Sequence, residues 1–99
     1  MNYRIVWLDE AEEDYLTLIR YLRAEYGLKS AKKFKAKVES ITKRLEQHPH
    51  SSPKIGEESV RKAFVTKQTS MYYRVLDDEN EIEIMFLWNN RRNPDDLPI

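Results

Sequence analysis

Two pairs of adjacent basic residues are the side chains in this sequence best suited to chemistry. Arg61-Lys62 and Arg91-Arg92 each place two cations side by side. A guanidinium group makes forked hydrogen bonds to phosphate or carboxylate, and an ammonium group adds a compact point charge. The pairs are therefore the candidate catalytic residues, and they predict contact with an anionic group. Each also has a purely structural interpretation: local pairing with the aspartates of the tail for Arg91-Arg92, and an exposed strand end for Arg61-Lys62.

A second set of candidates is apolar and suits a binding surface. Tyr72, Met85, Leu87 and Trp88 lie in the C-terminal third of the chain, at strand positions expected to lie outside the face that the helices cover. If these side chains are exposed together, they form a patch for a partner protein or for a second copy of the chain. The alternative is that the C-terminal tail buries them.

Metal and nucleophile chemistry find little support. His48 and His50 flank Pro49, but no further ligands follow at the spacing that a zinc site requires. The sequence contains no cysteine, and Ser70 has no paired base. We expect no metal and no cofactor.

The N-terminal part predicts a strand followed by a helix. Residues 3–7 are rich in β-branched and aromatic types. Asp9 offers an N-cap and Glu12, three residues later, completes a capping-box pattern for a helix over 10–26. Gly27 then ends the helix in a left-handed conformation. Apolar residues recur along one side of this helix, at Ala11, Tyr15, Leu18, Ile19, Leu22 and Tyr26.

A second helix is predicted over 29–47, antiparallel to the first because the connection is so short. Its apolar positions follow a spacing of three and four residues, and lysines cover most of the remaining surface. Prolines, serines and a glycine make 48–59 an irregular loop. Three strands follow at 60–66, 70–76 and 81–88, with a turn at 77–80. In the last strand, Ile82, Ile84 and Phe86 are expected on one face.

These elements predict an α+β fold with the order β-α-α-β-β-β. Short connections favour an antiparallel sheet, and the helical hairpin should pack on one face of it. The 99 residues fit one domain, 1–99.

Charge is balanced overall but unevenly distributed. Residues 29–67 contain eleven basic and four acidic groups, a net charge of +7, whereas the segments on either side are acidic. Such a basic segment attracts phosphate or acidic partners, although a solvated helix face explains it equally. No apolar run is long enough to span a membrane, and the N-terminus does not resemble a signal peptide. We therefore expect a cytoplasmic protein.

Four segments, in this order and spacing, resemble the RelE/ParE superfamily of toxins, which includes plasmid stabilisation proteins. The first is the acidic start of the first helix, at 7–14. The second is the second helix with its exit at Pro49. The third joins Arg61-Lys62 to Tyr73-Arg74-Val75, and the fourth runs from Ile84 to Pro94.

The resemblance implies the toxin of a type II toxin–antitoxin module that arrests growth. It further implies a cognate antitoxin that folds over the toxin, and either a toxin homodimer or a heterotetramer with the antitoxin. One branch of the superfamily inhibits DNA gyrase by binding. Another cleaves mRNA on the ribosome, with strand lysines, two arginines and often a late tyrosine or histidine.

Carried over by position, only part of that catalytic set is present. Arg61 matches one strand cation, and Arg91 or Arg92 matches the arginine after the last strand. The remaining positions fall on Ala63, Ser70 and Leu97. Because a missing base and a missing cation lower the rate by orders of magnitude, the sequence favours inhibition of gyrase or another target through binding. The alternatives are the ribonuclease, a non-toxic interaction module on the same fold, and an RNA-binding protein that uses the lysine-rich helix.

Overall fold

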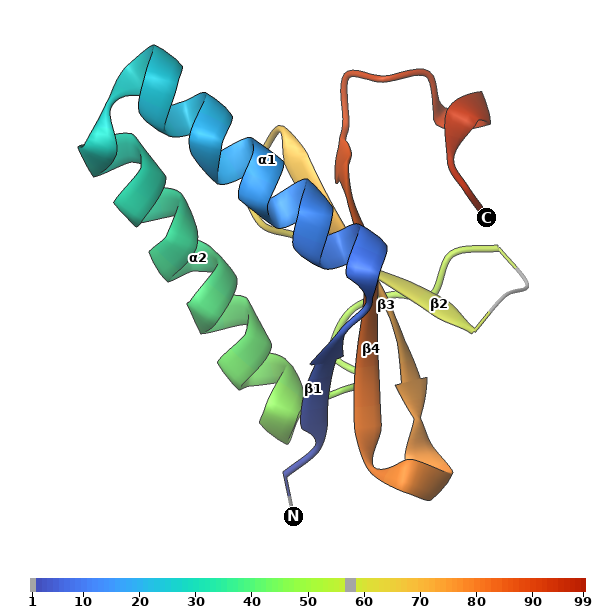
Figure 1. Cartoon of the computed structure of the whole chain (residues 1–99). Coiled ribbons are helices and arrows are strands. Elements are labelled where there is room, and N and C mark those ends of the chain that lie inside the picture. The colour runs from blue at the N-terminus through green and yellow to red at the C-terminus, as the bar shows by residue number, and fades with distance from the viewer. Residues whose placement is uncertain (1, 57–58) are drawn as a thin grey trace.

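The computed structural model describes residues 2–56 and 59–99 as two helices and a four-stranded sheet (Figure 1). The elements, in chain order, are β1 (Arg4–Trp7), α1 (Asp9–Tyr26), α2 (Leu28–Gln47), β2 (Val60–Phe64), β3 (Thr69–Leu76), η1 (Asp77–Glu79), β4 (Glu81–Asn89) and η2 (Pro94–Asp96). The predicted α+β order is confirmed, with most bounds within one or two residues. The predicted 48–59 loop is irregular as far as Gly56, and its residues 57–58 lie outside the described part of the chain.

The sheet has the order β1-β4-β3-β2. The three C-terminal strands are antiparallel neighbours, as their short connections predict. The expectation of an entirely antiparallel sheet is wrong, because β1 pairs with β4 in the parallel sense, Arg4 opposite Glu81 and Trp7 opposite Ile84. The whole helical hairpin separates β1 from the other strands in sequence, so the length of a connection gave no constraint on its direction.

The start of α1 differs from the predicted capping box. Leu8 is the N-cap, no side chain caps the helix, and the Glu12 amide donates to the Leu8 carbonyl at 3.0 Å. Asp9 is therefore the first helical residue. Its carboxylate, together with those of Glu10 and Glu12, lies in the first turn, where negative charge interacts favourably with the helix dipole.

Gly27 alone connects the two helices. Its φ of 95° and ψ of 171° lie in a region that side chains with a Cβ rarely adopt. The positive φ agrees with the predicted helix stop, but the ψ value differs from that of a left-handed helical cap. An extended ψ reverses the chain at once, so α2 begins at the next residue.

The main core lies between the hairpin and the sheet. From α2 it receives Phe34, Val38, Ile41 and Leu45, and from the sheet Met71, Tyr73, Ile82, Ile84 and Leu87. Rings of Trp7 and Tyr15 lie 5.2 Å apart, and those of Tyr15 and Phe34 6.3 Å apart, so aromatic contacts join β1, α1 and α2. The buried hydroxyl of Tyr73 donates to the Pro49 carbonyl at 3.1 Å, which fixes the exit of α2 to the sheet.

The hairpin extends beyond the sheet at its Gly27 end (Figure 1). Tyr26 was predicted as part of the core stripe, but 65% of it is exposed. The last turn of α1 has no sheet beneath it, and the apolar side of the helix there faces solvent.

A β-bulge in β4 changes which side chains face the helices. Tyr72 pairs with Phe86 and Tyr73 with Ile84, so Met85 has no partner on β3. One extra residue reverses the alternation. Phe86 was predicted on the same face as Ile84, but it joins the cluster on the opposite side of the sheet, while Leu87 turns toward the hairpin.

The second, smaller cluster lies on the sheet face away from the hairpin, which we call the open face. Val60, Tyr72, Phe86 and Trp88 form it, and Ile55, Met85 and Leu97 pack against it. The C-terminal tail thus covers side chains that the helices leave bare. So does the loop that carries Ile55, which we call the 50s loop.

No helix in the described ranges is long and apolar enough to cross a membrane.

Candidate functional site

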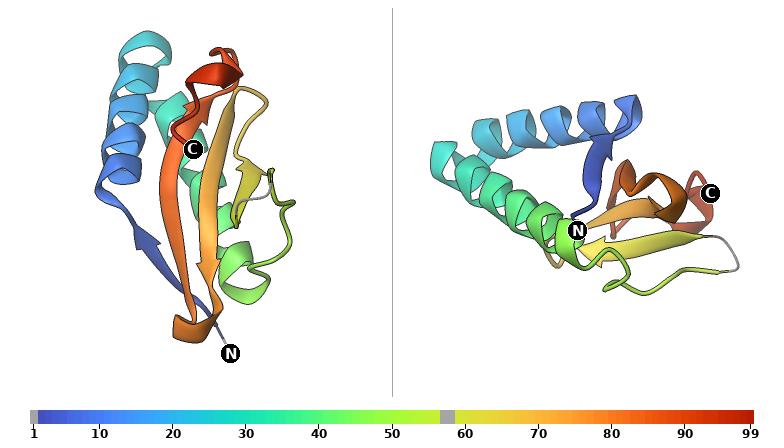
Figure 2. Two further views of the ribbon diagram at one scale, coloured as in Figure 1. Left: turned by 90° about the vertical axis from the view of Figure 1, so that its right-hand side faces the viewer. Right: turned by 90° about the horizontal axis from the view of Figure 1, so that it is seen from below.

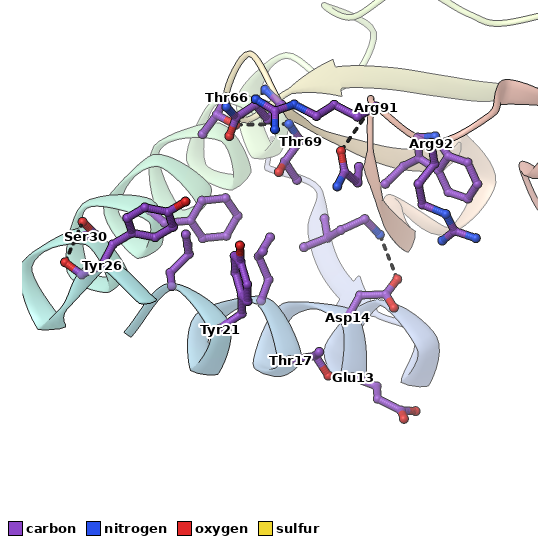
Figure 3. A pocket seen from close by; sticks show the side chains of 17 residues that line it. Glu13, Asp14, Thr17, Tyr21, Tyr26, Ser30, Thr66, Thr69, Arg91 and Arg92 are labelled. Atoms are coloured by element: carbon purple, nitrogen blue, oxygen red, sulfur yellow. Dashed lines mark hydrogen bonds between the residues drawn. The ribbon is translucent and has the colours of Figure 1, made fainter. Parts of the chain in front are cut away.

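A groove of about 840 Å³ lies between the projecting end of the hairpin and one end of the sheet (Figure 3). One wall is the second half of α1 with the first turns of α2, and the other is the β2–β3 connection with the segment after β4. Its floor consists of core side chains, Leu18, Leu22, Phe34 and Leu87. The groove exists because the hairpin is longer than the sheet it covers.

Two tyrosines form the helical wall. Tyr21 is 52% exposed and Tyr26 65%, although both are large aromatic residues. Their ring centroids are 6.3 Å apart in an edge-to-face arrangement, and a hydrogen bond with Tyr26 raises the pKa of the Tyr21 hydroxyl. Exposed, mutually oriented tyrosines suit a binding surface, because they offer apolar area and a polar tip at little entropic cost.

Two arginines lie on the opposite wall. Arg91 and Arg92 are exposed, and Arg91 extends toward Thr66 and Thr69 in Figure 3. The Arg92 guanidinium carbon lies 4.3 Å from the centre of the Trp88 ring, so a cation–π contact holds the charged group against that ring. Within residues 2–56 and 59–99 neither arginine forms an ion pair, so the alternative interpretation, local pairing with the tail aspartates, is not seen in that part of the chain.

Asp14 lies at one end of the groove and connects helix α1 to strand β4 of the sheet. Its Oδ2 accepts the Leu87 amide at 3.1 Å, at a point where β1 has already left the edge of β4. Burial raises the pKa of this carboxyl above its usual range, and the Leu87 amide and Arg92 partly oppose the effect. A carboxyl with a raised pKa beside an arginine can act in proton transfer, but here its hydrogen bond already serves the sheet.

The other basic pair lies elsewhere. Arg61 donates from Nη1 to the Ser52 carbonyl at 2.6 Å and to the His50 carbonyl at 3.3 Å, so it braces the loop after α2. Lys62, the next residue, points to the open face, where its Nζ lies 4.9 Å from the Phe64 ring centre and 5.8 Å from that of Tyr72. The adjacent cations thus face opposite sides of the sheet.

The two basic pairs are also separated along the strands. Arg61 is level with Tyr73, whereas Asn89, which precedes the arginine pair, is level with Thr69. Four residues of strand separate these rows, about 13 Å. The four candidate cations therefore do not converge on one phosphate-sized site.

The predicted apolar patch is not exposed as a unit. Tyr72 is 2% exposed and Trp88 6%, because the tail and the 50s loop cover them on the open face. Leu87 is buried under the hairpin, and Met85 is half-buried at the bulge. The expectation that the four form one exposed surface is wrong, since the consecutive residues Leu87 and Trp88 face opposite sides of the sheet and both are buried.

Sequence reasoning found part of the groove and missed the rest. Arg91, Arg92, Leu87 and Trp88 were candidates and do line it. Tyr21 was missed, yet it carried a usable signal, because it is an aromatic residue outside the apolar stripe of α1. The polar residues of the β2–β3 connection gave no such signal, since only the tertiary arrangement brings them to the groove.

Geometrically, the site is a concave surface with an aromatic wall and a cationic wall. It offers no assembled nucleophile, base and acid among the described residues. Its chemistry suits an amphipathic segment with acidic groups, held by apolar contacts along the tyrosines and by forked hydrogen bonds to the arginines.

The fold is similar to solved toxin structures. A structure described as a chromosomal ParDE toxin–antitoxin system from P. aeruginosa has a TM-score of 0.72 at 20% identity, covering 88% of this chain and 95% of that one. The toxin–antitoxin complex RelBE2 from Mycobacterium tuberculosis has a TM-score of 0.64 at 18% identity, covering 91% and 100%. A mutant of E. coli RelE in the free state has a TM-score of 0.64 at 11% identity, covering 92% and 86%. At these identities the likeness concerns the fold.

Family membership comes from the sequence itself. A comparison with curated proteins finds no match. The family model described as the ParE toxin of the type II toxin–antitoxin system parDE matches residues 5–94, which includes both α-helices and all four strands except the first residue of β1. The chain therefore belongs to the ParE toxin family of type II toxin–antitoxin systems.

Proposed function

We propose that this toxin arrests growth by binding its target without chemical catalysis, and that the target is DNA gyrase. The observation that carries the proposal is the separation of the cations. Arg61 binds loop carbonyls and Lys62 faces the opposite side of the sheet. Arg91-Arg92 follow the end of β4, whose last residue is four strand positions from the row of Arg61. Cleavage of RNA needs cations, a base and an acid around one phosphate.

The choice of gyrase rests on the family and on the resemblance to the gyrase-inhibiting branch. The ribonuclease remains the second candidate because Arg61 and the arginine pair occupy two of its positions. Messenger RNA would then have to approach a surface where Arg61 already donates to two carbonyl groups.

Two assays side by side test the target. The purified toxin is expected to inhibit supercoiling by gyrase and to leave mRNA intact in a coupled translation reaction. Arg61→Gln is expected to leave inhibition unchanged apart from its effect on stability, since Arg61 braces a loop. Cleavage of mRNA that disappears in Arg61→Gln and in Arg91→Gln would refute the binding mechanism. Soluble expression without growth arrest would favour the non-toxic interaction module.

We further propose that the groove binds the cognate antitoxin. Solved relatives include toxin–antitoxin complexes, among them RelBE2 and the YoeB–YefM heterotetramer. The exposed Tyr21, Tyr26 and Arg91, the last without an ion pair inside 2–56 and 59–99, fit an acidic, amphipathic segment that orders on binding. Such a segment would cover the aromatic wall of the groove and neutralise its cationic wall.

A matched pair of substitutions on α1 tests this assignment. Tyr21→Arg places a charge in the groove, whereas Leu16→Arg places one on the same helix outside it, at a residue that is 44% exposed. Tyr21→Arg is expected to weaken antitoxin binding at least tenfold in calorimetry and Leu16→Arg to change it less than threefold. Equal losses would place the antitoxin elsewhere.

We infer a cytoplasmic toxin that forms one domain over 1–99 and joins its antitoxin in a heterotetramer. Mass measurement of the purified complex in solution distinguishes this stoichiometry from a toxin homodimer that dissociates when the antitoxin binds.

A further inference from the structure

A row of lysines runs along the side of α2 that faces away from the sheet. At 3.6 residues per turn, Lys29, Lys32, Lys33 and Lys43 lie within roughly 60° of the direction opposite the buried stripe of α2. We call these four residues the α2 lysine row. The row is about 21 Å long at the helical rise per residue.

The lysines are exposed, and none of them forms an ion pair in the described ranges. The pairs found there are Arg4–Glu81, His50–Asp77 and Arg74–Glu83, all away from α2. The right-hand view of Figure 2 shows that no other element covers the outer side of α2. The charges are therefore open to a partner.

Helix stability does not account for the position of the row. Three of its four lysines lie in the first two turns of α2, which has no acidic residue in its first turn and no side-chain cap. Positive charge at that end opposes the helix dipole, and a negatively charged group outside the helix would relieve the repulsion.

The side chains between the lysines are small. Ala36 and Ser40 lie between Lys33 and Lys43 on the same side, and the row contains no aromatic or large apolar side chain. A protein partner is normally held by buried aromatic or aliphatic anchors, and single-stranded nucleic acid by aromatic rings that stack on bases. A duplex phosphate backbone needs only positive charges that can approach it closely.

The neighbouring helix fixes the direction of approach. α1 carries six acidic and two basic residues, whereas α2 carries seven basic and two acidic residues. Burial, followed by the charge of Glu39, raises the pKa of Tyr15 on α1, so Glu39 lies at the edge of the α2 lysine row nearer α1, one helical turn before Lys43. A polyanion is thus attracted to the outer side of α2 and repelled from the α1 side.

We propose that the α2 lysine row binds the phosphate backbone of duplex DNA, without reading its sequence. The choice of DNA over double-stranded RNA rests on the proposed function, because gyrase holds duplex DNA and a toxin bound to it lies beside that duplex. The row would add affinity for the gyrase–DNA complex while the groove remains a separate surface.

Direct binding to DNA tests the inference without gyrase. Fluorescence anisotropy with a labelled 20-base-pair duplex is measured across a series of salt concentrations. For the unmodified toxin, the logarithm of the binding constant is expected to fall linearly with the logarithm of the salt concentration. In the variant Lys29→Gln/Lys32→Gln/Lys33→Gln/Lys43→Gln, the slope of this line should be shallower by up to about 3.6, because each phosphate contact contributes about 0.9. Circular dichroism confirms that the variant remains helical.

The matched control removes four exposed charges elsewhere, as Arg20→Gln/Arg23→Gln/Lys54→Gln/Lys67→Gln. It is expected to keep the salt dependence of the unmodified toxin within one unit of slope. Equal losses in both variants, or no DNA binding at low salt, would overturn the inference. Stronger binding to double-stranded RNA or to polyglutamate would overturn the assignment to DNA. Inhibition of gyrase that persists without DNA binding would leave the proposed function intact and refute only this inference.

Discussion

At the scale of single residues, a few polar side chains tie together segments that are far apart in the sequence. Asp77, at the β3–β4 turn, accepts the Tyr3 hydroxyl at 2.7 Å and lies 3.2 Å from Nε2 of His50. It thereby connects the N-terminus, the loop after α2 and the β-hairpin. The hydrogen bond from Tyr3, followed by the contacts with His50, holds the pKa of the Asp77 carboxyl below its usual range.

This shift predicts a dependence of stability on pH. Because the folded-state pKa is lowered, the contribution of Asp77 is present above the pKa of the unfolded chain, about 3.9, and is lost as the pH falls through the folded value. Urea unfolding should show Asp77→Ala less stable than the unmodified protein at pH 7, with the gap narrowing as the pH falls below the pKa of the unfolded chain. Asp78→Ala, one residue along the same exposed turn, is the control and should match the unmodified protein across the same pH range.

Asp14 should behave in the opposite way. Its folded-state pKa is raised, so its contribution is present below the unfolded pKa and is lost as the pH rises through the folded value. Asp14→Asn keeps an acceptor for the Leu87 amide without the charge, and its stability relative to the unmodified protein should be greater at pH 7 than at pH 3. Asp14→Ala leaves that amide without an acceptor and should cost about 1–3 kcal/mol at pH 7. Similar losses for Ala and Asn would contradict the role of the hydrogen bond.

At the scale of elements, the connection between the helices depends on one backbone conformation. A Cβ at Gly27 meets no atom within 4 Å, so any cost of Gly27→Ala comes from its φ of 95°. We expect a loss of about 1–3 kcal/mol in thermal or urea unfolding. Gly56→Ala, at a φ of 59° in the ordinary left-handed region, is the comparison and should cost less. A neutral Gly27→Ala would mean that the connection relaxes.

The elements themselves could be predicted from sequence because each has a local signal. The spacing of Phe34, Val38 and Ile41 identified α2, and alternation identified the start of β4. The parallel pairing of β1 had no local signal, since its partner lies more than 70 residues away. The bulge at Met85 was also hidden, because a continuous apolar stretch reads the same with either face inward.

The candidate site was predicted only in part for a related reason. Arg91 and Arg92 were found from residue type, and their place in a groove depends on how far the hairpin extends past the sheet. Arg61 and Lys62 were grouped as neighbours in sequence, but strand alternation sends their side chains to opposite faces. Residue type thus identified the cations, while the tertiary arrangement determined which of them can act together.

At the scale of the whole molecule, the sheet lies between two layers of unequal thickness. The hairpin covers one face, while the 50s loop and the tail cover the aromatic cluster of the open face. The layer formed by the 50s loop and the tail is the thinner one, and it depends on few contacts. The tail contributes Leu97, which is half-buried against the cluster. The open face should therefore be the easier side to expose.

Matched substitutions in the tail test this asymmetry. Leu97→Asp places a charge against Trp88, Phe86 and Tyr72, whereas Ile99→Asp changes a residue that is 50% exposed. Leu97→Asp should shift tryptophan emission to the red and increase the binding of a hydrophobic dye, with helix content unchanged. Ile99→Asp should change neither signal, and a response to both would mean that the whole tail acts as one cover.

The pairing of β1 with β4 has a consequence for synthesis. Residues 4–7 are synthesised 77 residues before their partners at 81–84. At translation rates of about 5–20 residues per second, the first strand waits roughly 4–15 s for its neighbour. Until residues 81–84 are made, β1 has no strand to pair with, and the four-stranded sheet cannot be completed.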